Sequence, residues 1–222
     1  MASMTNTISE NDSPPSTATR KKRLVAIVAG VLVVILLAAL AAIFGPGLVG
    51  FQSSSNNAKP AAPSASAAPV QLTEYRNDQV GIALSYPSSW AVLKSKDPQV
   101  LLVASEGALG TFQLRAVDLP TVVGPQQLPA AKQLTDQIIG ANKSAKMLTE
   151  PKQIELGGLP GYWYLYTFKD DSSGQEGAHS HFFVFKGKTM LSFVFETIPS
   201  AQFRDAAPTF DQITSSFHVL KK

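Results

Sequence analysis

The chain has 222 residues, no cysteine, and a formal net charge of +3 at pH 7. The absence of cysteine excludes disulfides, thiol catalysis and an anchor built on a lipid-modified cysteine. The net charge comes from the N-terminal part, because residues 71–222 carry 14 Lys and Arg side chains against 14 Asp and Glu. A nucleic-acid-binding domain should carry a basic stripe on its folded surface, so we expect no nucleic-acid partner.

The chain begins with a polar segment, Met1–Thr19, that is rich in Ser, Thr, Asn and Pro. It has no apolar periodicity with which to build a core, and we expect it to be disordered. The basic block Arg20–Arg23 follows directly. Residues 1–23 are therefore predicted to be a disordered tail that ends in a basic stop.

An unbroken apolar run of 21 residues, Leu24–Phe44, follows the basic block. As a helix it would be about 31 Å long, which matches the hydrocarbon core of a bilayer. Because basic residues stay on the cytoplasmic side, we predict a single-pass signal-anchor in the cell membrane, with the N-terminus cytoplasmic and the C-terminal part extracytoplasmic. A cleaved signal peptide is the alternative, but its apolar region normally spans about 7–15 residues.

Residues 45–70 are predicted to be an Ala/Pro/Ser-rich linker. From Gln52 to Pro69 every residue except Lys59 is Gln, Ser, Asn, Ala or Pro, a composition typical of extended tethers. The remaining residues, 71–222, have the length of one ordinary domain. We therefore expect an exported domain that is held near the outer face of the membrane.

The first half of this domain has the alternating pattern of strands. Ile82, Leu84 and Tyr86 alternate with small or polar residues and are followed by the turn Pro87–Ser89. Further strands are predicted at 90–93, 100–104 and 111–117. The period then changes, because apolar residues recur at helical spacing after Pro129 and stop at Gly140. This pattern predicts a helix.

The second half returns to strands, which are predicted at 152–156, 162–168, 178–185 and 189–196. Short turns or polar loops connect them, so we expect an antiparallel meander. A final helix is indicated by apolar residues from Phe203 to Phe217. Because proline breaks a helix interior, we predict a short turn at Ser200–Asp205, a main helix that begins near Pro208, and a short last strand at 218–220.

Two segments resemble a known family. Tyr75–Trp90 combines an aromatic start, a glycine, an alternating strand and the pattern Tyr-Pro-x-x-Trp, and it resembles the opening of the Mog1/PsbP-like superfamily. Phe210–Phe217 is similar to the last helix of that superfamily running into an x-Ser-Phe strand, and the turn Gly157–Gly161 before an aromatic strand also fits. The resemblance implies an α+β domain in which helices cover a mainly antiparallel sheet, an α/β/α sandwich.

The combination of anchor and domain is similar to actinobacterial envelope proteins of the LpqN type. Those proteins carry a lipid anchor, which a chain without cysteine cannot have. Members of the superfamily serve as accessory or binding proteins, so the resemblance implies a non-enzymatic module without a cofactor. A fold does not determine function, and the ligand stays open.

An aromatic strand supplies the candidate binding residues. Tyr162, Tyr164, Tyr166 and Phe168 fall on one face of the predicted strand, with Trp163 and Leu165 opposite. Aromatic residues on both faces suit a central strand covered by helices on both sides. Alternatively, amphipathic tyrosines could line part of a groove for an acyl chain, sugar or peptide. From this face we name Tyr164, Tyr166 and His181 as candidate ligand-binding residues, and we assign no catalytic residue.

His179 and His181 lie two residues apart on a predicted strand, so their side chains share one face. Such a pair could bind zinc with one further ligand. The candidates for that ligand are His218, Asp170, Asp171 and Glu176. Because Phe183 and Phe185 continue the same face, a histidine packed over aromatic rings is the ordinary explanation, and we predict no metal site.

These observations predict a membrane-anchored envelope module that engages a partner protein or an apolar envelope ligand. The alternative is a metal-dependent or hydrolytic envelope enzyme that uses His179 and His181.

Overall fold

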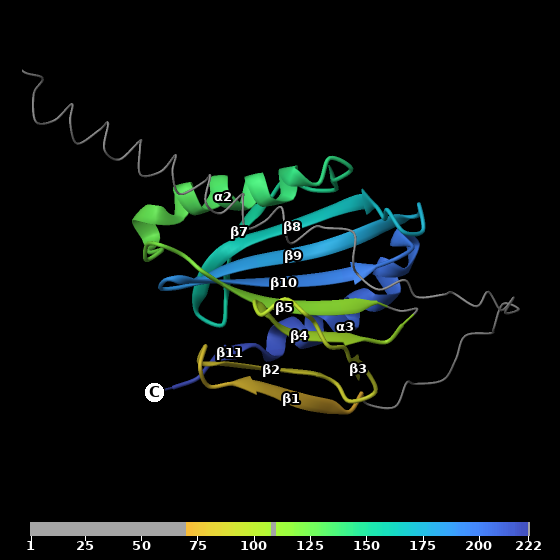
Figure 1. Cartoon of the computed structure of the whole chain (residues 1–222), viewed down its shortest axis with the longest axis horizontal. Coiled ribbons are helices and arrows are strands. Elements are labelled where there is room, and N and C mark those ends of the chain that lie inside the picture. The colour runs from red at the N-terminus through yellow and green to blue at the C-terminus, as the bar shows by residue number, and fades with distance from the viewer. Residues whose placement is uncertain (1–69, 108–109, 222) are drawn as a thin grey trace, which may run out of the picture. The chain divides into compact units, whose positions relative to one another are not determined.

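The computed structural model describes residues 70–107 and 110–221 of the chain (Figure 1). The predicted tail, the predicted membrane span and all but the last residue of the predicted linker lie outside the described residues. Within those two ranges, no helix is long and apolar enough to cross a membrane. The elements in chain order are β1 (Leu72–Asn77), β2 (Ile82–Pro87), β3 (Ala91–Val92), β4 (Val100–Ser105), β5 (Thr111–Asp118), η1 (Pro125–Gln127), α2 (Leu128–Ala141), β6 (Lys146–Met147), β7 (Lys152–Leu156), β8 (Leu159–Lys169), β9 (Glu176–Lys186), β10 (Thr189–Thr197), η2 (Ser200–Gln202), α3 (Phe203–Ser216) and β11 (His218–Val219).

The strands form two sheets. The larger sheet has eight strands in the order β3-β4-β5-β10-β9-β8-β6, with β7 also pairing with β8, and the smaller has the order β1-β2-β11. Every strand pairing between described residues is antiparallel. The predicted meander is confirmed, because β8, β9 and β10 are neighbours in both sequence and space (Figure 1).

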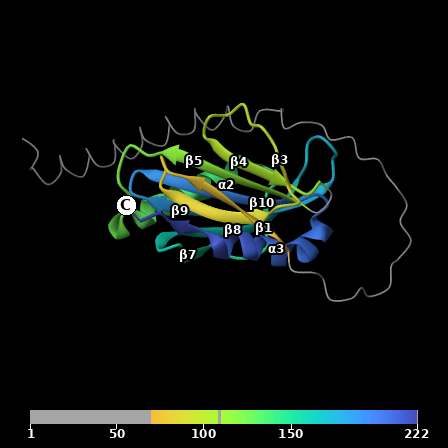
Figure 2. The same cartoon turned by 90° about the horizontal axis from the view of Figure 1, so that it is seen from below.

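The main core lies between one face of the large sheet and α3 with the small sheet (Figure 2). Phe195 on β10 packs against Phe210 on α3, with ring centroids 4.9 Å apart. Phe193 meets Phe217 edge-on at the same separation of 4.9 Å. Leu84 of β2 belongs to the same buried cluster, so the aromatic rings of the sheet are sealed by both helix and strand.

The second helix covers the opposite face of the large sheet. α2 lies along β8 (Figure 1), and the Tyr162 hydroxyl donates a hydrogen bond to the carbonyl of Leu128 at its start. In the register, Tyr162 stands opposite Phe183 of β9, and Phe183 stands opposite Ser192 of β10. Phe193 and Phe195 therefore point to the other face. Helices on both faces confirm the α+β class, while the separate small sheet was not predicted.

Two local predictions need correction, and one strand of the small sheet was missed. β8 does not occupy the centre of the sheet, because it lies next to the edge formed by β6 and β7, and Trp163 on its second face is only half-buried. The strand β1 was not predicted because its sequence does not alternate and its residues are exposed or half-buried. The last helix begins at Phe203 and contains Pro208. Pro208 and the preceding turn at Arg204 are exposed, so water can bind the carbonyl that loses its donor.

Candidate functional site

Polar side chains gather on the α2 face of the large sheet, where three adjacent strands bring alternate residues together. His179 of β9 stands opposite Tyr166 of β8 on one side and opposite Glu196 of β10 on the other. His181 lies two residues along β9, and Ser192 lies on the same face of β10. The period-two geometry of the meander therefore builds one polar row within an aromatic surface.

These five residues form a continuous series of hydrogen-bond contacts, which we call the polar chain. Glu196 Oε2 lies 2.7 Å from His179 Nε2, and His179 Nδ1 lies 2.9 Å from the hydroxyl of Tyr166. The same hydroxyl lies 3.4 Å from His181 Nδ1, and His181 Nε2 lies 2.7 Å from Ser192 Oγ. Each imidazole therefore uses both ring nitrogens.

Burial controls the protonation of the middle of the polar chain. Tyr166 and His181 are both 5% exposed. Desolvation raises the pKa of Tyr166, and the negative charge of Glu196 adds to the effect. Desolvation also lowers the pKa of His181 well below its ordinary value, with the nearby His179 and Arg115 acting in the same direction. At neutral pH His181 is therefore an uncharged imidazole and Tyr166 an intact phenol.

Aromatic rings enclose the two histidines. The His181 ring stacks on Phe183, with 3.9 Å between centroids, and the His179 ring lies 4.2 Å from that of Phe168. Apolar neighbours of this kind exclude water and strengthen the hydrogen bonds that remain.

A second polar cluster adjoins Ser192. Arg115 of β5 stands opposite Ser192 in the register and is 8% exposed. Its Nη2 donates to Asp97 Oδ2 at 2.8 Å and to Gln99 Oε1 at 2.9 Å. Burial is the largest influence on the pKa of Arg115 and lowers it, while Asp97 opposes that change. The cluster ties the connection between β3 and β4 to the sheet.

Tyr164 does not join the polar chain. Its hydroxyl lies 2.6 Å from Thr135 Oγ1 and donates to Asp136 Oδ1 at 2.8 Å, so it fastens α2 to β8. Lys132 forms a salt bridge with the same carboxylate at 2.8 Å. Desolvation is the main cause that raises the pKa of Tyr164. Of the three predicted binding residues, the structure brings together only Tyr166 and His181.

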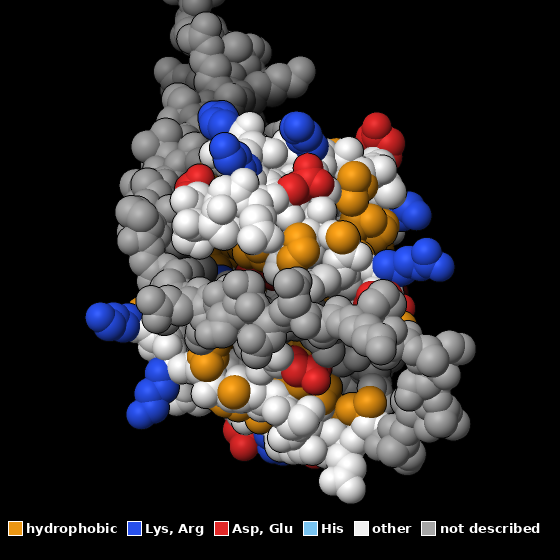
Figure 3. All heavy atoms as spheres, turned by 90° about the vertical axis from the view of Figure 1, so that its right-hand side faces the viewer, with side chains coloured by type: hydrophobic (Ala, Val, Ile, Leu, Met, Phe, Trp, Pro, Cys, Tyr) orange, Lys and Arg blue, Asp and Glu red, His pale blue; other side chains and the backbone are white. Residues whose placement is uncertain are grey.

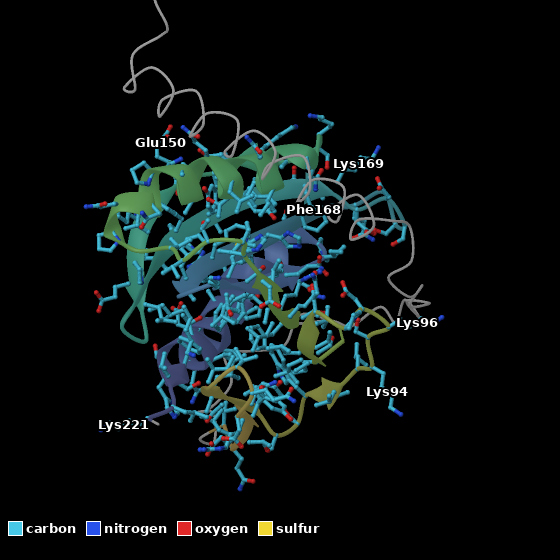
Figure 4. The ribbon with its side chains drawn as sticks, turned by 60° about the vertical axis from the view of Figure 1, so that its left-hand side comes forward. Lys94, Lys96, Glu150, Phe168, Lys169 and Lys221 are labelled. Atoms are coloured by element: carbon cyan, nitrogen blue, oxygen red, sulfur yellow. The ribbon has the colours of Figure 1, made fainter. Side chains whose placement is uncertain are left out.

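The aromatic face that could have lined a groove is filled by packing. The exposed fractions are 4% for Tyr162, 1% for Tyr164, 5% for Tyr166 and 8% for Phe168. Beside this face lie two hollows at the surface. One, of about 310 Å³, is lined by residues that include Ile139, Ala145, Met147, Pro151 and Tyr164. The other, of about 330 Å³, is lined by residues that include Lys143, Lys146, Phe168, Lys169 and Glu176; Phe168 and Lys169 lie side by side at the end of β8 (Figure 4).

The described residues do not assemble the ligands of the metal hypothesis. Within 70–107 and 110–221, no group of three or more His, Asp or Glu side chains could hold a metal ion. His218 lies on β11 in the small sheet. Asp170 accepts hydrogen bonds from Ser172 and Ser173 within its own loop, and Glu176 accepts one from Ser200.

Sequence reasoning missed Ser192, Glu196 and Arg115. The sequence did indicate Ser192 and Glu196, because they are polar residues at alternate positions, and hence on one face, of the apolar strand 189–197. The same alternation places Arg115 and Gln113 on one face of β5. A polar residue at an inward position of a buried strand needs a hydrogen-bond partner. In this meander the neighbouring strands provide it.

No family model and no curated protein matches the sequence. Among solved structures, the chain is similar to cyanobacterial PsbP (CyanoP) from Synechocystis, with a TM-score of 0.52 and 17% identity over 72% of this chain and 99% of that one. The described domain has a Mog1/PsbP-like fold. It is also similar to LpqN of Mycobacterium tuberculosis, a protein involved in cell envelope biogenesis, with a TM-score of 0.47 and 12% identity over 69% of this chain and 93% of that one. Identities this low establish the PsbP-like fold and no shared activity.

Proposed function

We propose that the protein is a non-enzymatic accessory module of the cell envelope that is anchored in the membrane by Leu24–Phe44. Two features of the sequence support this location: the basic block Arg20–Arg23 before the apolar run, and the polar linker after it. The charge balance of residues 71–222 fits a soluble domain outside the membrane. On the face drawn in Figure 3, basic and acidic side chains are interspersed.

The filled aromatic face favours a protein partner over an apolar ligand. The hydroxyls of Tyr162, Tyr164 and Tyr166 all have hydrogen-bond partners within the domain. An acyl chain or sugar would have to displace these bonds and the packing of α2. The outer surface is therefore the better candidate for contact. Met147 and Leu148 are 42% and 55% exposed at the β6 edge, beside the smaller hollow.

A topology experiment tests the location. Alkaline phosphatase fused after Lys222 should be active, because it folds only outside the cytoplasm, and a cytoplasm-dependent fluorescent protein at the same position should stay dark. The reverse result would contradict both the envelope location and the proposal of an envelope partner.

A crosslinking experiment in cells tests the partner. A photoreactive residue at Leu148 should give a discrete protein adduct, whereas the same residue at Asp171, exposed in the β8–β9 loop, serves as the control. A lipid adduct at Leu148 would favour the apolar-ligand alternative. Equal labelling at both positions would contradict a specific contact at the β6 edge.

One observation favours a second candidate, a hydrolytic enzyme. Ser192 Oγ lies 2.7 Å from His181 Nε2, which is the contact of a nucleophile with its base. However, Ser192 is 5% exposed and β10 is paired on both sides, so its backbone N–H belongs to the sheet and cannot stabilise an oxyanion. A fluorophosphonate probe should therefore leave the protein unlabelled. Labelling that disappears in Ser192→Ala would establish the enzyme instead.

A further inference from the structure

The polar chain has one self-consistent hydrogen arrangement when Glu196 is ionised and His179 is neutral. An ionised carboxylate only accepts hydrogen bonds, so His179 must donate from Nε2 to Glu196. His179 Nδ1 is then bare and accepts from the Tyr166 hydroxyl. The oxygen of that hydroxyl accepts from His181 Nδ1–H, and His181 Nε2 accepts from the Ser192 hydroxyl. Four hydrogens make four bonds, and all run from Ser192 toward Glu196.

One additional proton at the Glu196 end reverses three of the four bonds, while His179 Nε2–H still donates to Glu196. When the His179–Glu196 pair holds that proton, both nitrogens of His179 carry hydrogen, so Nδ1 donates to Tyr166. Tyr166 then donates to His181 Nδ1, and His181 must carry its hydrogen on Nε2 and donate it to Ser192 Oγ. His181 stays neutral and changes only its tautomer. The fifth hydrogen of the chain is then the hydroxyl hydrogen of Ser192, which His181 no longer accepts.

We propose that the polar chain is a proton-responsive element, in which uptake of one proton by the His179–Glu196 pair reverses the three hydrogen bonds from His179 to Ser192 and frees the hydroxyl hydrogen of Ser192. Glu196 and Ser192 are four residues apart on one strand, which corresponds to about 13 Å. Protonation at the Glu196 end thus changes the hydrogen bonding of Ser192, which is too far away for direct contact.

The two ends of the polar chain differ in their access to water. The Glu196 side chain is 33% exposed and that of His179 is 13% exposed, whereas Ser192 and His181 are each 5% exposed. Phe168, whose ring is tilted against that of His179, also lines the larger hollow. Glu196 and His179 are therefore the end at which a proton enters from solvent.

Charged and titratable groups surround the polar chain on each neighbouring element. Tyr166 faces His179 from β8, Glu196 faces it from β10, and His181 lies beside it on β9. Arg115 acts on His181 from β5 and is itself paired with Asp97. The larger hollow adds Lys143, Lys146, Lys169 and Glu176 near Phe168. Within this set, Glu196 is the acid in contact with either histidine, and we therefore place the added proton on the His179–Glu196 pair.

The released hydroxyl lies beside the Arg115 cluster. Ser192 is the register partner of Arg115, whose bonds to Asp97 and Gln99 hold the segment between β3 and β4. Lys94 and Lys96 extend outward from that segment (Figure 4). The freed hydroxyl is therefore placed beside the residue that holds this exposed segment.

Nitrogen NMR of histidine-labelled full-length protein in detergent micelles tests this element directly. The chain has three histidines, and the exposed His218 on β11 serves as an internal reference. As pH falls, the His181 hydrogen should move from Nδ1 to Nε2 with the same midpoint as protonation of His179. In Glu196→Gln, the amide oxygen can still accept from His179 but carries no charge, so both changes should shift together to lower pH.

Two tyrosine variants separate coupling from general damage. Tyr166→Phe removes the hydroxyl that links the two histidines, so the His181 tautomer should no longer depend on the protonation of His179. The matched control is Tyr164→Phe, which removes a buried hydroxyl of the same strand outside the polar chain and should leave the coupling intact. A His181 that keeps one tautomer while His179 gains its proton would overturn the inference, as would a coupling that survives in Tyr166→Phe.

Discussion

Thr135 and Tyr164 join α2 to the large sheet through a contact of 2.6 Å between their hydroxyl oxygens. Thr135 is fully buried, at 0% exposure, and Tyr164 is 1% exposed. The Tyr164 hydroxyl also reaches Asp136, so the helix is held by two adjacent residues. This arrangement explains why a threonine occupies the buried face of a helix whose other inward residues are apolar.

Replacing Thr135 by valine should lower the free energy of unfolding by about 1 kcal/mol, because the shape is kept while one buried hydrogen bond is lost. The Tyr164 hydroxyl keeps Asp136 as a partner, which limits the cost. Chemical denaturation followed by tryptophan fluorescence measures the change. In the Tyr164→Phe background the same substitution should cost less, and an equal cost would show that the contact contributes no coupling energy.

Truncation of Phe210 to alanine should cost about 3–5 kcal/mol. Phe210 is 2% exposed and its ring contacts Phe195 and Trp90, so the substitution opens a cavity between α3 and the sheet. Phe203→Ala, at a half-buried position two turns earlier on the same helix, is the control with a smaller cost. Equal losses in the two variants would mean that α3 is not packed as described.

The predicted turn between β7 and β8 allows substitutions at two adjacent glycines to be compared. Gly157 and Gly158 connect β7 to β8 with φ of +59° and +76°, the backbone of a tight hairpin turn. A Cβ on Gly157 would lie 2.7 Å from the Phe217 ring, whereas one on Gly158 would meet nothing within 4 Å. Gly157→Ala should therefore cost about 1–3 kcal/mol, and Gly158→Asn much less, as measured by thermal unfolding. Similar costs would contradict the close approach of Phe217.

Most strands and both helices could be predicted because their signals are local. The alternation of Ile82, Leu84 and Tyr86 and the helical spacing from Ala131 to Ile138 arise within single elements. The separate small sheet could not be predicted. β1 has no alternating pattern and pairs only with β2. β2 pairs in turn with β11, whose residue His218 stands opposite Ala83 although the two lie far apart in the sequence.

The candidate site shows the same limit. His179, His181 and Tyr166 were recognisable because they share strand faces, but Ser192 and Glu196 joined them only through the register of β9 with β10. A register depends on which residues the turn at Gly187 places opposite one another. Sequence periodicity fixes the face on which a side chain lies and leaves its partner undetermined.

Acid should destabilise the domain through His181. Because the pKa of His181 is lowered in the folded state, the unfolded chain binds the proton more readily below the ordinary histidine value of about 6.5. Stability from this group is therefore complete above that pH and is lost as pH falls toward the folded pKa, by up to about 1.4 kcal/mol per pH unit.

His181→Asn should be less stable at neutral pH but should show a flatter loss of stability between pH 6.5 and 5. The control, His218→Asn at an exposed position, should leave the pH dependence unchanged. Denaturation curves at several pH values measure both effects, and a slope in His181→Asn equal to that of the unmodified protein would show that another group carries the acid sensitivity.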